Sequence, residues 1–416
     1  MTLEIRRQTE TPWLDPATYW PRMTAATAEL DPPYGAICLP ALSHNAYEML
    51  RRANGTTIRV ASKSVRVRGV IDAVLAVPGF AGVLSYTLPE ALWLAEGDEQ
   101  HPPIMDVVVG YPTVDRSAIR QLATDPALAA RITLMIDGVE QLDLIDAVLS
   151  PRERETIRVC LEFDASWSSR ILGHVGTWRS PVASVEDARA LARIIVGRAG
   201  FSLVGTMAYE GQIAGLVNEP AGSPLRGALV RWIQKQSVNE LADRRASVVS
   251  MLRGLTELEF VNGGGTGSLE STSSEDAVTE IAAGSGLFGP HLFDHYRHFA
   301  PAPAAAFALS VVRKPRDGIA TLLGGGWVAS GPPAADRLPL VAWPPNTKMV
   351  AREMAGEVQT PLTGPGAASL VAGDRVWLRH TKAGELSEHL NGFAIVDGGR
   401  VIGAELTYRG EGQVFL

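Results

Sequence analysis

Lysine is scarce in this sequence. Only five of the 38 Lys and Arg residues are lysines. The guanidinium of arginine stays protonated and does not form an imine, so chemistry that needs a nucleophilic amine has few possible sites. Those sites are Lys63, Lys235, Lys314, Lys348 and Lys382.

Cysteine, positive charge and long apolar runs are also lacking. Cys38 and Cys160 lie far apart in apolar, strand-like runs, which predicts reduced core residues and no metal-ligand pair. A net charge of -7 gives no electrostatic reason to expect nucleic acid or an anionic membrane as a partner. No run approaches a membrane span, and the amino terminus lacks the apolar core of a signal peptide. We therefore expect a soluble, cytoplasmic protein.

Strand-like and helical stretches alternate regularly through the middle of the chain. Eight strand-like runs are each bounded by turn or helix signals, and helical spacing of apolar residues follows most of them. This count predicts a (β/α)8 barrel, and a doubly wound open sheet is the alternative because it uses the same alternation. The runs are Thr57–Ser62, Gly82–Tyr86, Met105–Val109, Ile132–Ile136, Val159–Phe163, Ser202–Met207, Glu259–Asn262 and Ala277–Ile281.

Composition divides the chain into three segments. Residues 1–36 are predicted to form an arm, and 37–300 the barrel. Residues 301–416 lose helical periodicity and carry short β-type runs punctuated by Gly and Pro, which predicts a C-terminal all-β domain. The apolar run 37–42 is expected to join that domain as a strand, and Ser43–Ala53 is expected to be a helix capped by Ser43.

Lys63 ends the first strand-like run of the predicted barrel. In α/β barrels the chemistry lies at the carboxyl ends of the strands, so this position is a candidate for a reactive amine. The alternative is an ordinary charged side chain that reaches solvent from a strand end.

Two glycine-rich runs follow the seventh and eighth predicted strands, where barrels commonly bind phosphate. Asn262–Ser268 and Gly284–Gly286 allow a close backbone approach to an anion, and the hydroxyls of Thr266 and Ser268 could add donors. A helix expected after Gly286 would also favour an anion at its amino end. Together with Lys63, these runs predict a phosphorylated cofactor that forms an imine, and pyridoxal phosphate is the obvious one.

At these positions the chain resembles the fold-type III pyridoxal-phosphate enzymes of the alanine racemase N-terminal-domain superfamily. It is most similar to the branch of D-threonine aldolase and the eukaryotic-type D-serine dehydratases. The family motif Arg-Pro-His-x-Lys is matched at its first and last residues, while Val60 and Ala61 depart from it. The resemblance spans the barrel in order, at Arg59–Lys63, Leu161–Asp164 with Arg170, Tyr209–Gln212, Asn262–Ser268, and Glu280 with Gly284–Ser285.

The resemblance implies roles for individual residues. Lys63 would be the Schiff-base lysine and then the base at Cα of the substrate. Arg170 would contact the pyridine nitrogen, although a salt bridge to Glu162 or Asp164 is an alternative for it. Tyr209 would contact the cofactor or the substrate. The remaining cofactor-binding residues implied are Gly264, Gly265, Thr266, Gly284, Ser285 and Gly286.

A second implied site lies in the C-terminal domain. There, the related enzymes have a His-x-Asp or His-x-Cys pair that binds a divalent metal such as Mn or Zn. His380 matches the histidine, but Lys382 stands in place of the acid or thiolate, and a protonated ammonium cannot ligate a metal. Either the metal is absent, or Glu385, Glu388 or His389 supplies a ligand. Lys382 could instead bind a substrate carboxylate or act in acid–base chemistry, so His380 and Lys382 are both catalytic candidates.

The resemblance therefore implies a lyase, in the form of a homodimer, that acts on a D-amino acid with a β-hydroxyl group, by retro-aldol cleavage or by dehydration. Three alternatives stay open. The first is an amino-acid racemase of the same fold. The second is a non-catalytic carrier of pyridoxal phosphate. The third is a barrel enzyme on sugar phosphates in which Lys63 forms an imine with the substrate itself.

Overall fold

The computed structural model describes residues 3–332 and 334–416. The described chain forms two compact units, and each is assembled from segments that are separated in sequence. The barrel unit comprises Met49–Lys63, Leu75–Gly284 and Phe415–Leu416. The β unit comprises the described residues up to Glu48, together with Ser64–Val74 and Ser285–Val414.

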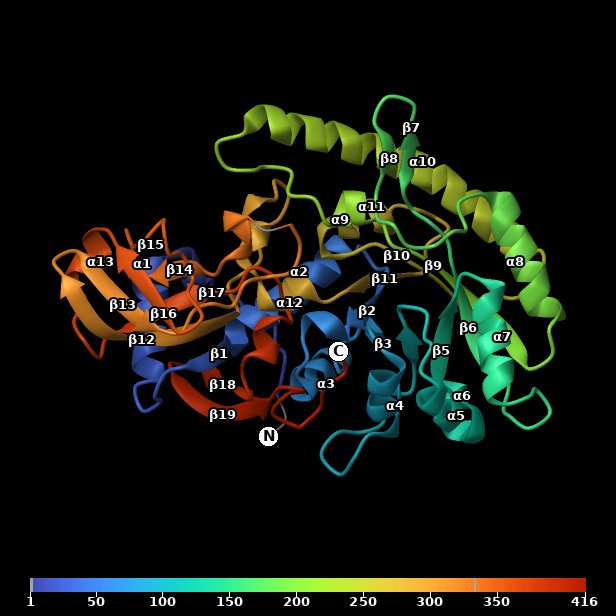
Figure 1. Cartoon of the computed structure of the whole chain (residues 1–416), viewed down its shortest axis with the longest axis horizontal. Coiled ribbons are helices and arrows are strands. Elements are labelled where there is room, and N and C mark those ends of the chain that lie inside the picture. The colour runs from blue at the N-terminus through green and yellow to red at the C-terminus, as the bar shows by residue number, and fades with distance from the viewer. Residues whose placement is uncertain (1–2, 333) are drawn as a thin grey trace. The chain divides into compact units, whose positions relative to one another are not determined.

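Eight parallel strands close into a ring in the barrel unit (Figure 1). Their order is β10-β11-β2-β3-β4-β5-β6-β9, and the ring is completed by the pairing of β9 with β10. The predicted barrel is therefore confirmed, and each of the eight expected runs contributes one strand. The strands are β2 Thr57–Ala61, β3 Phe80–Ser85, β4 Val107–Val109, β5 Ile132–Ile136, β6 Ile157–Glu162, β9 Phe201–Ala208, β10 Phe260–Gly263 and β11 Glu280–Ala283.

The helices between these strands begin and end at the residues that local chemistry favours. Ser184 caps α8 by accepting from the backbone of Asp187 in a capping box, and α10 starts at Pro224 and stops at Gly254. Within the described chain, no helix combines the length and the apolar character that crossing a membrane requires. The helices of the barrel unit include α4 Leu88–Glu96, α5 Arg116–Thr124, α6 Pro126–Arg131, α7 Val139–Val148, α8 Val185–Gly197, α9 Gly211–Ala214, α10 Pro224–Arg253 and α11 Leu269–Ser273.

Apolar side chains fill the ring. Cys160, one of two free cysteines, is fully buried there, and Cys38 is buried in the β unit, so both are core residues as the sequence predicts. One buried cluster consists of Val108, Met135, Cys160, Val204, Met207 and Phe260.

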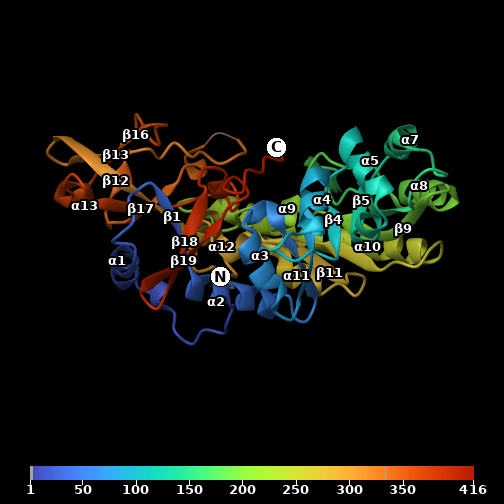
Figure 2. The same cartoon turned by 90° about the horizontal axis from the view of Figure 1, so that it is seen from below.

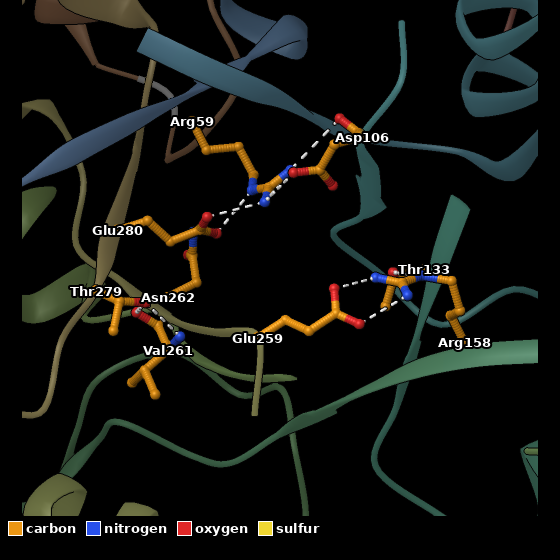
Figure 3. Close-up of polar contacts among 9 residues, drawn as sticks. All are labelled: Arg59, Asp106, Thr133, Arg158, Glu259, Val261, Asn262, Thr279 and Glu280. Carbon is orange, nitrogen blue, oxygen red and sulfur yellow. Dashed lines mark hydrogen bonds and ion pairs between the residues drawn. The ribbon is translucent and has the colours of Figure 1, made fainter. Parts of the chain in front are cut away.

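An ionic network centred on Arg59 lies toward the amino ends of the barrel strands, since Glu280 begins β11 and Asp106 immediately precedes β4. Figure 3 shows its polar contacts. Arg59 of β2 is only 2% exposed and donates to both oxygens of Glu280, at 2.7 and 2.8 Å, and to Asp106 at 2.8 Å. Asn262 donates to Glu280 at 2.8 Å. Burial alone would lower the pKa of Arg59, but the two carboxylates raise it above its ordinary value, so Arg59 is a permanent buried cation.

A nine-stranded sheet dominates the β unit, and its main path runs β15-β16-β13-β12-β1-β18-β19. Strand β17 pairs with β12 and with β14. The early strand β1 lies between two late ones, antiparallel to β12 and parallel to β18, as both views show (Figures 1 and 2). The strands are β1 Tyr34–Cys38, β12 Ala305–Arg316, β13 Ile319–Leu323, β14 Leu340–Trp343, β15 Lys348–Met349, β16 Gln359–Thr363, β17 Arg375–Arg379, β18 Gly392–Asp397 and β19 Arg400–Leu406.

Three local expectations are wrong. The run 37–42 is a strand only to Cys38, and α2 (Leu39–Arg52) begins four residues before the predicted cap at Ser43. Pro40 does not break this helix because a proline in the first turn has no intrahelical hydrogen bond to lose. The helix expected after strand eight is a single turn, α12 (Ser285–Phe288), which is too short for a helix dipole to hold an anion.

Candidate active site at the carboxyl end of the barrel

Lys63 lies at the carboxyl end of β2, where the sequence places it. The strand runs into a one-turn 3-10 helix, Ser62–Ser64. Ser62 is fully buried and its hydroxyl donates to the carbonyl of Leu84 at 3.1 Å, which fixes the turn against β3. The next side chain, Lys63, is exposed, and its Nζ donates to Oη of Tyr111 at 3.1 Å.

A continuous run of contacts crosses the barrel end from Lys63. Tyr111 follows β4 and was not singled out in the sequence. The guanidinium of Arg179 lies 5.2 Å from the ring centre of Tyr111 and 4.3 Å from that of Tyr209, which follows β9. Both distances are within the range of cation–π attraction. The ends of β2, β4 and β9 therefore bring an amine, a phenol, a guanidinium and a second aromatic ring together.

Glu162 adds a titratable carboxyl group to this cluster. It is the last residue of β6 and is 3% exposed, and its Oε1 lies 4.0 Å from Nη1 of Arg179. Burial raises the pKa of Glu162 to about 7, while Arg179 opposes that rise. The carboxyl group is therefore partly protonated near neutral pH. We call Lys63, Tyr111, Glu162, Arg179 and Tyr209 the mouth cluster.

Three glycines of the predicted anion loop, Gly263, Gly264 and Gly265, lie where a Cβ would meet neighbouring atoms. Gly264 has a φ of +75°, and a Cβ there would lie 2.7 Å from Ile281. A Cβ on Gly263 would lie 3.0 Å from the guanidinium of Arg245. Gly265 is partly exposed, and a Cβ on it would lie 2.9 Å from Ala214 and 3.8 Å from the ring of Tyr209. The loop therefore borders the mouth cluster at Gly265.

A buried ionic network lies behind this loop. Glu210, 1% exposed, accepts from Arg245, from Thr272, and from the hydroxyl of Ser268 at 3.1 Å. Arg245 is fully buried and also pairs with Glu275 at 2.5 Å. Burial would lower the pKa of Arg245, but the two carboxylates raise it. Two hydroxyls that follow the glycines are thus fixed to one carboxylate, and Ser268, expected as a possible anion donor, donates to Glu210 instead.

The other predicted residues of this end are placed differently. Arg170 is exposed, in the turn between β7 (Trp167–Ser169) and β8 (Gly173–Val175), and Arg179, nine residues later, is the arginine beside Tyr209 and Glu162. Gly284 is buried, and a glycine is needed there because a Cβ would lie 2.4 Å from the carbonyl oxygen of Ala61. Ser285 and Gly286 open α12, which belongs to the β unit.

Gln212 is the last residue of the Tyr209–Gln212 stretch. It is 3% exposed, on α9, and its Nε2 donates to the carbonyl of Ala165 at 2.6 Å. Its Oε1 is buried without a hydrogen-bond partner among the described residues. A buried acceptor without a donor lowers the stability of the folded protein. It therefore marks a position where a bound group could donate a hydrogen bond.

His380 and Lys382 lie in the β unit. His380 is 5% exposed, neither of its ring nitrogens makes a well-formed hydrogen bond within the described chain, and burial together with Arg379 lowers its pKa to about 3. Nζ of Lys382 lies 3.4 Å from Oγ of Ser330. His380 is therefore a neutral imidazole, and Lys382 is a hydrogen-bond donor to Ser330.

The substitute metal ligands that the sequence offers are engaged elsewhere. Glu385 accepts from the backbone of Ser330, Glu388 pairs with Arg66, and His389 stacks on Trp327 with ring centres 5.2 Å apart. Across residues 3–332 and 334–416, no three His, Cys, Asp or Glu side chains gather in a way that could hold a metal ion. The residues around His380 do not fit a metal site, and we derive no step through one.

Two residues of the mouth cluster, Tyr111 and Arg179, were missed from the sequence. Tyr111 lies two residues past the fourth predicted strand, a position at which barrels place site residues, so its location was a usable signal. Arg179 was hidden because the β7–β8 hairpin separates it from β6, and the first arginine after the strand is Arg170.

Known proteins resemble this chain in sequence over part of its length and in fold over most of it. No family model matches it. It is 26% identical over 263 residues to a 3-hydroxy-D-aspartate aldolase of Paracoccus denitrificans, an alignment that covers 63% of this chain and 61% of that protein. The chain thus matches about three fifths of the length of this curated relative.

Solved structures extend the likeness to almost the whole chain. A D-threonine aldolase from Filomicrobium marinum matches with a TM-score of 0.73 and 19% identity, covering 93% of this chain and 97% of that one. A D-threo-3-hydroxyaspartate dehydratase from Delftia sp. HT23 matches with a TM-score of 0.68 and 21% identity, over 91% and 97%. An alanine racemase from Bacillus anthracis matches with a TM-score of 0.59 and 14% identity, over 92% and 99%. The resemblance to fold-type III enzymes that the motifs indicate is confirmed as a likeness of fold.

Proposed function

We propose that this chain is a pyridoxal-phosphate-dependent lyase that acts on a β-hydroxy-D-amino acid. One observation carries the proposal. The amine of Lys63 and the glycine loop at Gly265 are joined by an unbroken run of contacts through Tyr111, Arg179 and Tyr209. An imine-forming amine and an anion-binding loop at one end of a barrel are the two anchors that this cofactor requires. The names of the similar proteins supply the substrate class.

The residues present fit the cofactor. Gly265 leaves room that a Cβ would fill, beside the ring of Tyr209. We propose that the backbone of Gly264, Gly265 and Thr266 holds the phosphate group. Lys63 would hold the aldehyde carbon. When bound, pyridoxal phosphate would supply the electron sink for the pair released when a bond to Cα breaks.

Arg179 replaces Arg170 in our assignment. Its guanidinium already touches two aromatic rings and a carboxylate of the mouth cluster, whereas Arg170 is exposed on a hairpin turn. A guanidinium keeps its proton at all working pH values, so it can orient a ring nitrogen or a substrate carboxylate through hydrogen bonds. Lys63 would move the proton at Cα of the substrate, as the exposed amine beside the bound group.

Replacing Glu210 by glutamine is expected to weaken binding of pyridoxal phosphate by about tenfold, or about 1.4 kcal/mol. Glu210 accepts from Ser268 of the loop and from Thr272 of α11, and it pairs with Arg245, so its loss loosens the phosphate anchor. Affinity for pyridoxal, which lacks the phosphate, should fall much less. Fluorescence titration of the apoprotein with both compounds gives the ratio.

Asp146→Asn is the matched control for that variant. Asp146 on α7 also accepts from two guanidiniums, Arg154 at 2.7 Å and Arg198 at 2.8 Å. It should change stability without changing the ratio of the two affinities. Equal losses of pyridoxal phosphate and pyridoxal affinity in Glu210→Gln would contradict the anchoring role.

The proposed function is tested by trapping and by a substrate screen. Borohydride reduction of the loaded protein should add the reduced cofactor to one tryptic peptide, the one that contains Lys63. The loaded protein should then cleave or dehydrate D-threonine, D-serine or D-3-hydroxyaspartate and leave the L-isomers intact. Because the residues around His380 do not fit a metal, the rate should be the same with a chelator and with added manganese or zinc. A protein that binds no cofactor at Lys63, or turns over none of these substrates, would refute the proposal.

A further inference from the structure

Retro-aldol cleavage of a β-hydroxy amino acid needs a base for the hydroxyl proton, because the O–H electron pair becomes the carbonyl bond of the departing aldehyde. The residues around His380 do not fit a metal that could activate this hydroxyl. Lys382 stands beside His380 as a donor rather than an acceptor. The base must therefore be sought among the other groups that the chain brings together.

We infer that Tyr111 is this base. Its phenol oxygen takes the β-hydroxyl proton, while Lys63 moves the proton at Cα. The inference rests on the proposed function and extends it to a catalytic residue that no sequence motif indicated. Its geometric basis is the 3.1 Å contact between Oη of Tyr111 and Nζ of Lys63.

The reach of Tyr111 follows from the bonding of the substrate. The substrate amine takes the place of Nζ of Lys63, and the β-hydroxyl oxygen is three bonds from that amine. With bonds of about 1.5 Å, three bonds span roughly 2.5–3.7 Å. A phenol within hydrogen-bond distance of the displaced nitrogen can therefore meet the β-hydroxyl without a change of fold.

The charges around Tyr111 suit a proton acceptor. Burial alone would raise the pKa of the phenol, but Lys63 from the β2 turn and Arg179 from the segment after β8 lower it below its ordinary value. Glu162, 4.0 Å from Arg179, is the nearby group that could cancel this effect. Because burial raises the pKa of Glu162 to about 7, it cancels Arg179 only in part near neutral pH.

Glu162 is the rival base, and its position argues against it. It lies beside Arg179, which is separated from Lys63 by the ring of Tyr111 along the run of contacts. Oη of Tyr111 accepts from Nζ of Lys63 at 3.1 Å, whereas Glu162 has its ion pair with Arg179, at 4.0 Å. Glu162 therefore partly offsets the positive charge of Arg179, and Tyr111 contacts the substrate.

The proton and electron balance closes within these residues. Oη of Tyr111 gains the hydroxyl proton, the O–H pair forms the aldehyde carbonyl, and the Cα–Cβ bond breaks. Bound pyridoxal phosphate would accept the electron pair that this leaves at Cα. The ammonium of Lys63 gives a proton to Cα, which yields the shorter amino acid. Transfer of the proton from Tyr111 to Lys63 across their 3.1 Å contact restores both groups.

The test uses Tyr111→Phe in the full, cofactor-loaded chain. We expect the kcat for cleavage of D-threonine or D-3-hydroxyaspartate to fall by about 10²–10⁴, the usual contribution of one acid–base group. Exchange of the Cα proton of glycine with deuterated water needs Lys63 but no β-hydroxyl base, so its rate should be unchanged. Borohydride trapping at Lys63 should give the same yield as in the wild type.

A second readout needs no cofactor. Ultraviolet difference titration of the apoprotein should show a tyrosine ionisation below the ordinary range of a phenol, and Tyr111→Phe should remove it. Tyr34→Phe is the control, since that phenol bonds to Thr27 at 2.7 Å within the β unit. It should remove neither the early titration nor the activity.

The outcomes separate this inference from the proposed function. Selective loss of cleavage, with glycine exchange and trapping retained, supports Tyr111 as the β-hydroxyl base. Equal cleavage in Tyr111→Phe and the wild type, equal loss of cleavage and exchange, or an unchanged apoprotein titration overturns it while the lyase assignment stands. A wild-type protein that exchanges glycine but neither cleaves nor dehydrates these substrates overturns the lyase assignment and the base with it. Dehydration without cleavage overturns the base alone.

Discussion

Lys63→Met is expected to reduce turnover by more than about 10⁴-fold. General acid–base catalysis by one group is worth about 10²–10⁴, and in the proposed mechanism Lys63 supplies this as well as the covalent attachment. Methionine has a similar length and fills the same space at the end of β2, so the barrel should stay folded. The measurement combines the kcat for D-threonine with mass spectrometry of the borohydride-reduced protein.

Lys235→Met is the matched control because Lys235 lies on α10 and has no place in the mouth cluster. It should keep full activity and the label on the Lys63 peptide. Since the chain has only five lysines, every alternative attachment can be tested one at a time. Label on another lysine in the wild type, or turnover that survives Lys63→Met, would remove Lys63 from the mechanism.

Glu280→Gln is expected to destabilise the barrel unit by about 3–5 kcal/mol, the usual cost of removing one partner from a buried ion pair. Arg59 would keep its charge with only one carboxylate, Asp106, whose side chain is 49% exposed. The change removes the negative charge and turns one of the two accepting oxygens into an NH2 group that cannot accept from Arg59, with almost no change in volume. Amide hydrogen exchange in β2 and β11 measures the effect within the barrel unit.

A double variant, Arg59→Met with Glu280→Leu, separates pairing from packing. Removing both charges leaves no unpaired buried ion, so the double variant should lose less stability than Glu280→Gln alone. If the double variant instead loses as much stability as Arg59→Met and Glu280→Leu lose together as single variants, the two side chains do not act as a pair. The ionic network would then not explain the destabilisation by Glu280→Gln.

Much of the barrel could be predicted from sequence because its signals are local. Buried parallel strands are short apolar runs, and caps such as Ser184 and breaks such as Gly254 mark the helices between them. The position of Lys63 after the first run was enough to place it at the carboxyl end of the ring. The start of α2 was misplaced because a proline in a first helical turn has the same appearance in sequence as a break.

The partners within the candidate site could not be predicted in the same way. Whether Arg170 or Arg179 meets Tyr209 depends on the β7–β8 hairpin, whose strands are only three residues each and carry no clear alternation. The contact between Tyr111 and Lys63 joins residues 48 positions apart through the closure of the ring. The role of Glu280 likewise depended on its partner, because a carboxylate at a strand start is solvated unless a buried cation such as Arg59 faces it.

The pairing of β1 with β18 has a consequence for biosynthesis. Tyr34–Cys38 leaves the ribosome long before Gly392–Asp397 is made. At roughly 5–20 residues per second, the nascent strand waits tens of seconds for its neighbour. During that interval its unpaired edge is open to other chains, so translation speed and chaperone supply should govern the yield of this protein more than they govern that of proteins whose sheets pair in order of synthesis.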